Sequence, residues 1–150
     1  MEKEELIPCW LDCDPGIDDL FGILLAAHSK KTKLIGVSTV AGNQTLEKTT
    51  RNTLKIFNLL GLVKNPSEQG VKSLDSEANG LACPIIKGCS KPLLRQLELC
   101  EYIHGEDGLQ TLSKTELPSV PQHAFDYIDR LNTQPYHFTT LIYKYLQEAR

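Results

Sequence analysis

The sequence predicts an α/β fold built on a parallel sheet. Strand and helix patterns alternate over about the first sixty residues, the strand patterns are short apolar or β-branched runs, and polar turns follow them. Parallel strands joined by helices require right-handed crossovers, and ligands of such sheets collect outside the carboxyl ends of the strands. We therefore expect functional residues in the turns that follow the strands.

The first strand and the first helix flank a cluster of acidic residues. Residues 6–11 form an apolar run that predicts a buried strand, and apolar residues at helical spacing predict a helix over about 18–29. Between them, residues 12–19 read DCDPGIDD and carry four carboxylates in eight residues. Like charges at this density raise one another's pKa or recruit a counter-ion, and a divalent cation with oxygen ligands is the usual partner.

The acidic turn also admits three other interpretations. Asp18 and Asp19 fall in the first helical turn, where free N–H groups and the helix dipole favour carboxylates without a metal; this explains one of them well but not the whole cluster. An EF-hand loop is excluded, because its required oxygen ligand, Gly and Glu are replaced by Gly16, Ile17 and Ile23. A haloacid-dehalogenase-like phosphotransferase also has a DxD pair after its first strand, but it does not predict Pro-Gly followed by two further aspartates, so it is a distant alternative.

The second strand and helix repeat the first pattern. Residues 34–40 are rich in β-branched side chains and are ended by residues 41–43, which predicts a strand followed by a turn. Residues 46–60 carry apolar side chains near helical spacing, and Gly61 is placed to end that helix. Asn43 therefore falls at the same end of the sheet as the acidic turn.

Beyond residue 61 the patterns weaken. Prolines, glycines and polar residues over 62–83 predict a long loop or an insertion. Further along we expect a short strand at 83–88, a short helix at 90–98, a flexible segment at 102–108, an amphipathic helix from Ser119, and over 138–150 either a strand running into a helix or one amphipathic helix. All of these elements are assigned to a single domain over 1–150.

Composition excludes several classes of protein. The formal net charge is −3 and no Lys/Arg stripe is visible, which argues against a nucleic-acid partner. No apolar window is long enough to span a membrane, and the acidic start does not fit a secretory signal. The five cysteines contain no CxxC pair, which disfavours disulfides and zinc. We therefore expect a cytoplasmic protein without a membrane contact.

Five segments, in order, resemble the inosine-uridine-preferring nucleoside hydrolases. They are DCDPGIDD at 12–19, VAGN at 40–43, TRN at 50–52, GCSKPL at 88–93 and HGE at 104–106. A lone DxD would be weak evidence, but five ordered segments in plausible structural contexts are specific. The resemblance implies the parallel-sheet, Rossmann-like fold of that family.

The resemblance also implies a tightly bound calcium ion (Ca2+). By analogy, Asp14 and Asp19 would be calcium ligands, Asp14 would also be the general base toward a water held by the metal, and Asp12 would buttress the turn. Calcium accepts six to eight oxygens, so it can hold water and ribose hydroxyls beside carboxylates. A water held in this way is easier to deprotonate and is aimed at the anomeric carbon.

Three further residues are given substrate-binding roles by the same resemblance. Asp18 would hydrogen-bond a ribose hydroxyl, Asn43 would help to fix the sugar, and His104 would lie on a mobile loop near the nucleobase. Each has a simpler interpretation as well. Asn43 is equally typical of a turn after a strand, and His104 is a lone loop histidine for which a structural role is as plausible.

The chain also departs from the family. Members are longer, and their second half supplies another calcium-binding Asp and a His that assists the leaving base, so we expect an N-terminal, truncated domain. The expected function is calcium-dependent hydrolysis of the N-glycosidic bond of purine and pyrimidine ribonucleosides such as inosine and uridine, impaired in this chain. A non-catalytic remnant that binds metal or a partner is the alternative, and the phosphotransferase is third. Nucleoside preference and homo-oligomerisation are left open.

Overall fold

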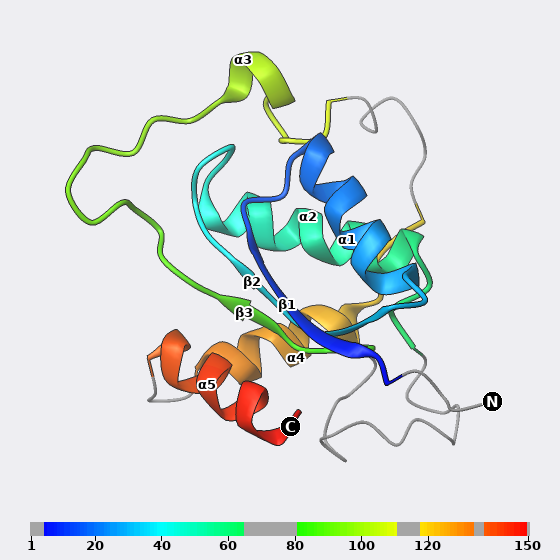
Figure 1. The fold of residues 1–150 in the computed structure, drawn as a ribbon. Helices are drawn as coiled ribbons and strands as arrows, with labels where there is room; N and C mark the ends of the chain where they lie inside the picture. The colour runs from blue at the N-terminus through cyan, green and yellow to red at the C-terminus, as the bar shows by residue number, and fades with distance from the viewer. Residues whose placement is uncertain (1–4, 65–80, 111–117, 134–136, 150) are drawn as a thin grey trace.

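The computed structural model describes residues 5–64, 81–110, 118–133 and 137–149. Its elements follow in the order β1 (Ile7–Cys13), α1 (Ile17–His28), β2 (Thr32–Thr39), α2 (Leu46–Leu59), β3 (Ile85–Lys87), α3 (Glu101–His104), α4 (Gln122–Asn132) and α5 (Phe138–Glu148). The three strands are parallel and lie in the order β1-β2-β3 (Figure 1). The predicted α/β fold with a parallel sheet is therefore confirmed.

Helices cover both faces of the sheet. Neighbouring residues of a strand point to opposite faces, so Ser38 and Thr39 of β2 mark the two sides. Thr39 Oγ1 lies 2.8 Å from Thr50 Oγ1 of α2. Ser38 Oγ accepts a hydrogen bond from Trp10 Nε1 at 3.1 Å, and the Trp10 ring packs against Tyr145 of α5 with 6.1 Å between centroids. Helices α2 and α5 therefore lie on opposite faces.

The main hydrophobic core lies between the sheet and helices α1, α2 and α4. Its buried members are Ile23, Val37, Leu54, Ile56, Phe57, Leu81, Cys83, Ile85, Ala124, Tyr127 and Ile128. Phe57 is fully buried there, and truncating such a side chain to alanine typically costs about 3–5 kcal/mol. This packing fixes the carboxyl ends of β1 and β2 relative to the first turns of α1 and α2.

The first two strand–helix pairs are confirmed with small changes in their bounds. Strand β1 continues to Cys13, two residues beyond the predicted end, so Asp12 lies in the strand and not in the turn. The reason is its pairing with β2, where Asp12 lies opposite Ser38. Helix α2 ends at Leu59, and Gly61 follows with a φ of 69°, a left-handed conformation that favours glycine.

The predicted helix at 90–98 is wrong. No helix forms over these residues, and Leu93 and Leu94 are 96% and 98% exposed. A short amphipathic helix is stable only when its apolar face packs against another element, and these leucines find no such surface. The chain instead runs without regular structure from β3 to α3, as the long green segment of Figure 1 shows.

The remaining elements decide three other expectations. Helix α3 covers the start of the segment expected to be flexible over 102–108, whose flexibility stays a prediction. The predicted third strand is confirmed over Ile85–Lys87, and the amphipathic helix is confirmed but begins at Gln122, three residues after Ser119. Of the two alternatives for 138–150, the single helix is correct, as α5. Most of the predicted loop or insertion lies outside the described residues. Its ends are tied by an antiparallel bridge between Val63 and Leu81.

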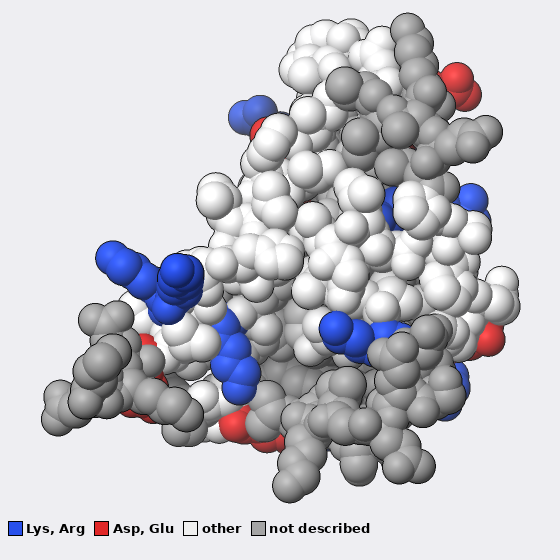
Figure 2. Space-filling view, turned by 90° about the vertical axis from the view of Figure 1, so that its right-hand side faces the viewer, with Lys and Arg blue, Asp and Glu red and all other residues white. Residues whose placement is uncertain are grey.

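Two general expectations concern the surface and the thiols. Within the described ranges, no helix combines the length and the apolar character that a membrane crossing requires. On the face drawn in Figure 2, Lys and Arg side chains stand in separate groups with uncharged surface between them. All five cysteines carry free thiols.

Candidate functional site

The acidic turn and the β2–α2 connection meet at the carboxyl end of the sheet, and Asn43 joins them. The Asn43 backbone N–H donates to Asp14 Oδ2 at 2.7 Å. Its side-chain amide donates to the Asp14 carbonyl oxygen at 3.0 Å and to Asp19 Oδ2 at 3.5 Å. Three residues that the sequence assigned to one site, from two separate turns, are thus brought together, as expected from the position of both turns at the carboxyl ends of the strands.

Asp19 lies close to the other carboxylates, and this position disfavours its ionised form. Burial raises the pKa of Asp19 above its ordinary value, and the negative charges of Asp14 and Asp18 raise it further. The backbone N–H of Gly16 donates to Asp19 Oδ2 at 3.2 Å and acts in the opposite direction, as does the charge of His104. Asp19 therefore performs the helix-capping role considered for it, while its charged form remains short of compensation.

Asp14 lies against the backbone of the β2–α2 connection. A methyl group built on Gly42 would meet Asp14 Oδ2 at 2.3 Å, so the carboxylate occupies the space that a side chain at position 42 would need. Asp14 is half-buried, whereas Asp18 in the first turn of α1 keeps 78% of its side chain exposed. The structure thus separates a carboxylate fixed by the backbone from one that faces solvent.

His104 reaches this site from a segment 87 positions beyond Ile17 in the chain. It is the last residue of α3, it is 8% exposed, and its Nδ1 accepts a hydrogen bond from the Ile17 backbone N–H at 3.4 Å. Its Nε2 lies 3.9 Å from Asp18 Oδ1. A methyl group on Gly16 would come within 2.6 Å of His104 Nδ1, so the ring packs directly on the acidic turn.

Asp12 lies apart from this group. Ser38 Oγ donates to Asp12 Oδ1 at 2.5 Å, on the face of the sheet that carries Trp10. The carboxylate therefore ties the carboxyl end of β1 to β2, at the next-to-last residue pair before the turn. This position suits a supporting residue.

Two polar residues of this region were not predicted. Gln44 and Asn52 are almost fully buried, with 0% and 1% exposure, and their side-chain amides bond the segment that carries His104. Asn52 belongs to the TRN segment of the resemblance, but no role was assigned to it. The one sequence signal was the run of polar side chains on the buried face of α2, which includes Thr49, Thr50 and Thr53.

The described residues offer part of a site for a hard cation. Asp14 and Asp19 provide carboxylate oxygens, which are the ligands that calcium prefers, and burial together with the charges of Asp14 and Asp18 raises the pKa of Asp19. Across the described ranges, no three His, Cys, Asp or Glu side chains are grouped closely enough to hold a metal ion. The donor set fits calcium in kind and supplies fewer than the six to eight oxygens of its full shell.

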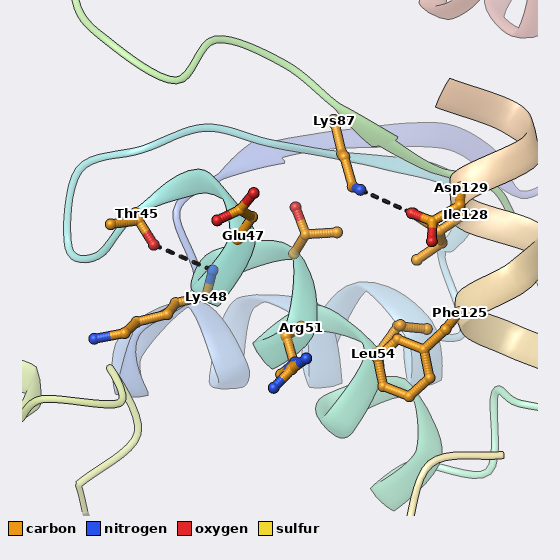
Figure 3. Close-up of a pocket in the computed structure, with 10 residues that line it drawn as sticks. Thr45, Glu47, Lys48, Arg51, Leu54, Lys87, Phe125, Ile128 and Asp129 are labelled. Atoms are coloured by element: carbon orange, nitrogen blue, oxygen red, sulfur yellow. Dashed lines mark hydrogen bonds and ion pairs between the residues drawn. The ribbon is translucent and has the colours of Figure 1, made fainter. Parts of the chain in front are cut away.

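A separate cavity of about 500 Å3 lies between α2, α4 and β3 (Figure 3). Across it Lys87 of β3 forms an ion pair with Asp129 of α4 at 3.0 Å. The Arg51 guanidinium lies 5.9 Å from the centroid of the Phe125 ring. None of the predicted site residues lines this cavity, so it is distinct from the acidic site.

Fold and site together define an α/β protein with clustered oxygen donors at the carboxyl ends of parallel strands. A sequence model described as "Inosine-uridine preferring nucleoside hydrolase" matches residues 9–143. The chain therefore belongs to the inosine-uridine preferring nucleoside hydrolase family, as the sequence predicted. This membership removes the phosphotransferase alternative.

Individual relatives agree with this assignment. The chain is 38% identical over 122 residues to a probable ribonucleoside hydrolase of Dictyostelium discoideum, covering 81% of the chain and 31% of that protein. It is 40% identical over 103 residues to the inosine-uridine preferring nucleoside hydrolase of Crithidia fasciculata, covering 69% of the chain and 27% of that protein. The chain thus spans less than a third of the length of these relatives.

Solved structures show the same fold. An inosine-guanosine nucleoside hydrolase superposes with a TM-score of 0.67 at 22% identity, covering 97% of the chain and 36% of that protein. A purine-preferring ribonucleoside hydrolase from Gardnerella vaginalis superposes with a TM-score of 0.56 at 28% identity, covering 76% of the chain and 31% of that protein. The described elements therefore correspond to part of a nucleoside hydrolase fold.

Proposed function

We propose that this chain carries the metal-binding and ribose-binding part of a calcium-dependent ribonucleoside hydrolase, which splits the N-glycosidic bond of purine or pyrimidine ribonucleosides into ribose and free base. The observation that carries the proposal is the meeting of Asp14, Asp19 and Asn43 at the carboxyl ends of β1 and β2, in a chain that belongs to this family. Relatives with these names supply the substrate class.

In this proposal Asp14 and Asp19 hold the calcium ion. When bound, calcium would orient the attacking water and both ribose hydroxyls and would make that water easier to deprotonate. Asp14 is the general base: its carboxylate takes the proton of the attacking water, while the Asn43 backbone N–H bond keeps it oriented. The nearby negative charges stabilise the oxocarbenium-like transition state, as in other glycoside hydrolyses.

Asp18, Asn43 and His104 bind the substrate. Asp18 has an exposed carboxylate that can accept a hydrogen bond from a ribose hydroxyl. The Asn43 Nδ2 already donates to the Asp14 carbonyl oxygen and to Asp19 Oδ2, so its Oδ1 is the atom that can accept from a sugar hydroxyl. His104 Nε2 lies 3.9 Å from Asp18 Oδ1, so the ring is close enough to this sugar-binding carboxylate to contact the base or the sugar. The proposal also includes a cytosolic location, because the five cysteines are free thiols and free thiols are typical of a reducing compartment.

Two measurements test the proposal. Calorimetric titration of the chain with calcium should give binding that Asp14→Asn and Asp19→Asn weaken strongly. The same change at Asp126, an exposed carboxylate on α4, should leave the affinity unaltered. Release of reducing sugar from inosine and uridine, beside a longer relative as standard, measures the hydrolase activity. Equal calcium affinities in all three variants would reject the metal assignment.

A second candidate is a non-catalytic protein that binds metal or a partner. One observation favours it: the described residues supply only part of the oxygen shell of a calcium ion. General acid assistance to a leaving group contributes typically ~10²–10⁴-fold in rate, and no residue assigned here supplies it. We therefore expect hydrolysis by this chain to be far slower than by the longer relative. Calcium binding without sugar release would select this second candidate.

A further inference from the structure

Gln44 forms hydrogen bonds to the segment 101–106, which carries His104. The Gln44 side chain is fully buried, and its Nε2 donates to the Glu106 carbonyl oxygen at 2.8 Å and to Glu101 Oε1 at 3.0 Å, with Gly105 O at 3.4 Å. Glu101 begins α3 and the other two residues follow its end. One amide therefore bonds both sides of the short helix that ends at His104.

Asn52 holds the same segment at a second point and joins it to the acidic turn. Its Nδ2 donates to the Asp107 carbonyl oxygen at 2.8 Å and to the Pro15 carbonyl oxygen at 3.3 Å. Gly108 follows with a φ of 81°, and a methyl group there would meet Asn52 Nδ2 at 2.8 Å. The Asn52 amide therefore packs directly against the backbone at Gly108, where a larger residue would not fit.

The orientation of His104 depends on this support. Helix α3 has four residues, too few to be stable through its own hydrogen bonds, so contacts with the rest of the chain fix its position. Because His104 Nδ1 accepts the Ile17 N–H, the neutral ring carries its proton on Nε2, the nitrogen that faces Asp18. A shift of α3 would break that bond and free the ring to exchange tautomers.

We propose that Gln44 and Asn52 are positioning residues of the ribonucleoside site: their buried amides hold residues 101–108 so that the Nε2–H of His104 faces the sugar-binding side of the acidic turn. The proposal rests on the proposed function for what His104 binds. It requires amides specifically, because each nitrogen faces two or more oxygen acceptors, and a carboxylate in the same place would be repelled by them.

The orientation can be measured on the 150-residue chain without substrate. Long-range ¹H–¹⁵N spectra of the imidazole rings, with His104→Gln to assign the resonances, report which ring nitrogen is protonated. We expect one Nε2–H tautomer in the unaltered chain and averaged tautomers in Gln44→Glu and Asn52→Asp. Asn58→Asp is the matched control, since Asn58 is also on α2 and its amide also donates to two carbonyl oxygens, Pro118 O and Ser119 O, far from the site.

A second arm separates positioning from a general structural role. With calcium present, His104→Ala should weaken inosine binding or turnover on the order of tenfold or more in the unaltered chain and hardly at all in the Gln44→Glu chain, where the ring is already misplaced. Gln44→Met keeps the size of the glutamine side chain but has no amide donor and no charge, and it should behave like Gln44→Glu.

The outcomes are distinct. If the spectra of His104 in the Gln44 and Asn52 variants match the unaltered chain, the proposal is overturned. It is also overturned if Gln44→Met and Asn52→Asp both lose their circular dichroism, because the residues then support the fold and not the ring. If the unaltered chain neither binds nor hydrolyses inosine, the proposed function fails, while the tautomer spectra still decide whether Gln44 and Asn52 position His104.

Discussion

Replacing Gly42 by alanine should disable the metal site while leaving the fold in place. The added methyl carbon would lie 2.3 Å from Asp14 Oδ2. Carbon and oxygen atoms in van der Waals contact are about 3.5 Å apart, so the carboxylate must move by about 1 Å. That movement breaks the 2.7 Å hydrogen bond from the Asn43 N–H, which fixes the orientation of Asp14.

The expected magnitudes follow from these contacts. A hydrogen bond to a charged group is worth about 1.5–3 kcal/mol, and alanine recovers about 0.4–1 kcal/mol by restricting the unfolded chain, so the free energy of unfolding should fall by about 1–2 kcal/mol. Only the end of a flexible side chain has to move, which keeps the loss small. Calcium affinity should fall by about tenfold or more, because a ligand displaced by 1 Å no longer matches the ion.

Gly22→Ala is the matched control. Gly22 lies in α1, and a methyl group there meets nothing within 4 Å, so the change should stabilise the chain by about 0.5–1 kcal/mol and leave calcium binding unaltered. Calcium titration calorimetry and thermal unfolding of the two variants and the unaltered chain measure both quantities. If Gly42→Ala bound calcium as tightly as Gly22→Ala, Asp14 could not be a fixed ligand, and the reasoning from the close contact would be refuted.

Two further predictions concern the sugar and the thiols. Asp18→Asn should impair binding and turnover of ribonucleosides while sparing calcium affinity, and 2′-deoxynucleosides should be poor ligands of the unaltered chain; equal binding of both sugars, by calorimetry, contradicts this. Burial raises the pKa of the Cys83 thiol to about 12, so iodoacetamide at pH 8 should modify exposed Cys89 long before Cys83, as peptide mass spectrometry can show. The unfolded Cys83 thiol ionises near 9, so the folded chain holds its proton longer, and stability should fall as the pH rises from about 9 toward 12; equal labelling rates would contradict this burial.

The part of the fold that the sequence predicts well is governed by local patterns. Apolar periodicity and turn residues are read within ten to fifteen residues, and β1, α1, β2 and α2 follow from them. The failure at 90–98 has a tertiary cause. Leu93 and Leu94 could form an apolar helical face, but no described element packs against them, and burial decides whether such a helix exists.

The same distinction between local patterns and tertiary contacts applies to the site. The meeting of Asp14 and Asn43 could be predicted because strand order alone brings the ends of β1 and β2 together. The contacts of Gln44 with Glu101 and of Asn52 with Asp107 join residues 57 and 55 positions apart, and no local pattern specifies them. The sequence therefore indicates which residues are chemically suited to the site but not which residues hold His104 in place.

Glycines decide how closely the parts of this site can approach. Methyl groups built at Gly42, Gly16 and Gly108 would lie 2.3 Å from Asp14 Oδ2, 2.6 Å from His104 Nδ1 and 2.8 Å from the side-chain amide of Asn52, whereas at Gly22 and Gly61 they would meet nothing within 4 Å. At the first three positions the backbone itself forms the wall against which a functional side chain rests. Such a wall cannot change rotamer, so it holds a carboxylate or an imidazole more rigidly than a neighbouring side chain could. Gly16, Gly42 and Gly108 are in this sense residues of the site, although they have no side chain to offer a ligand.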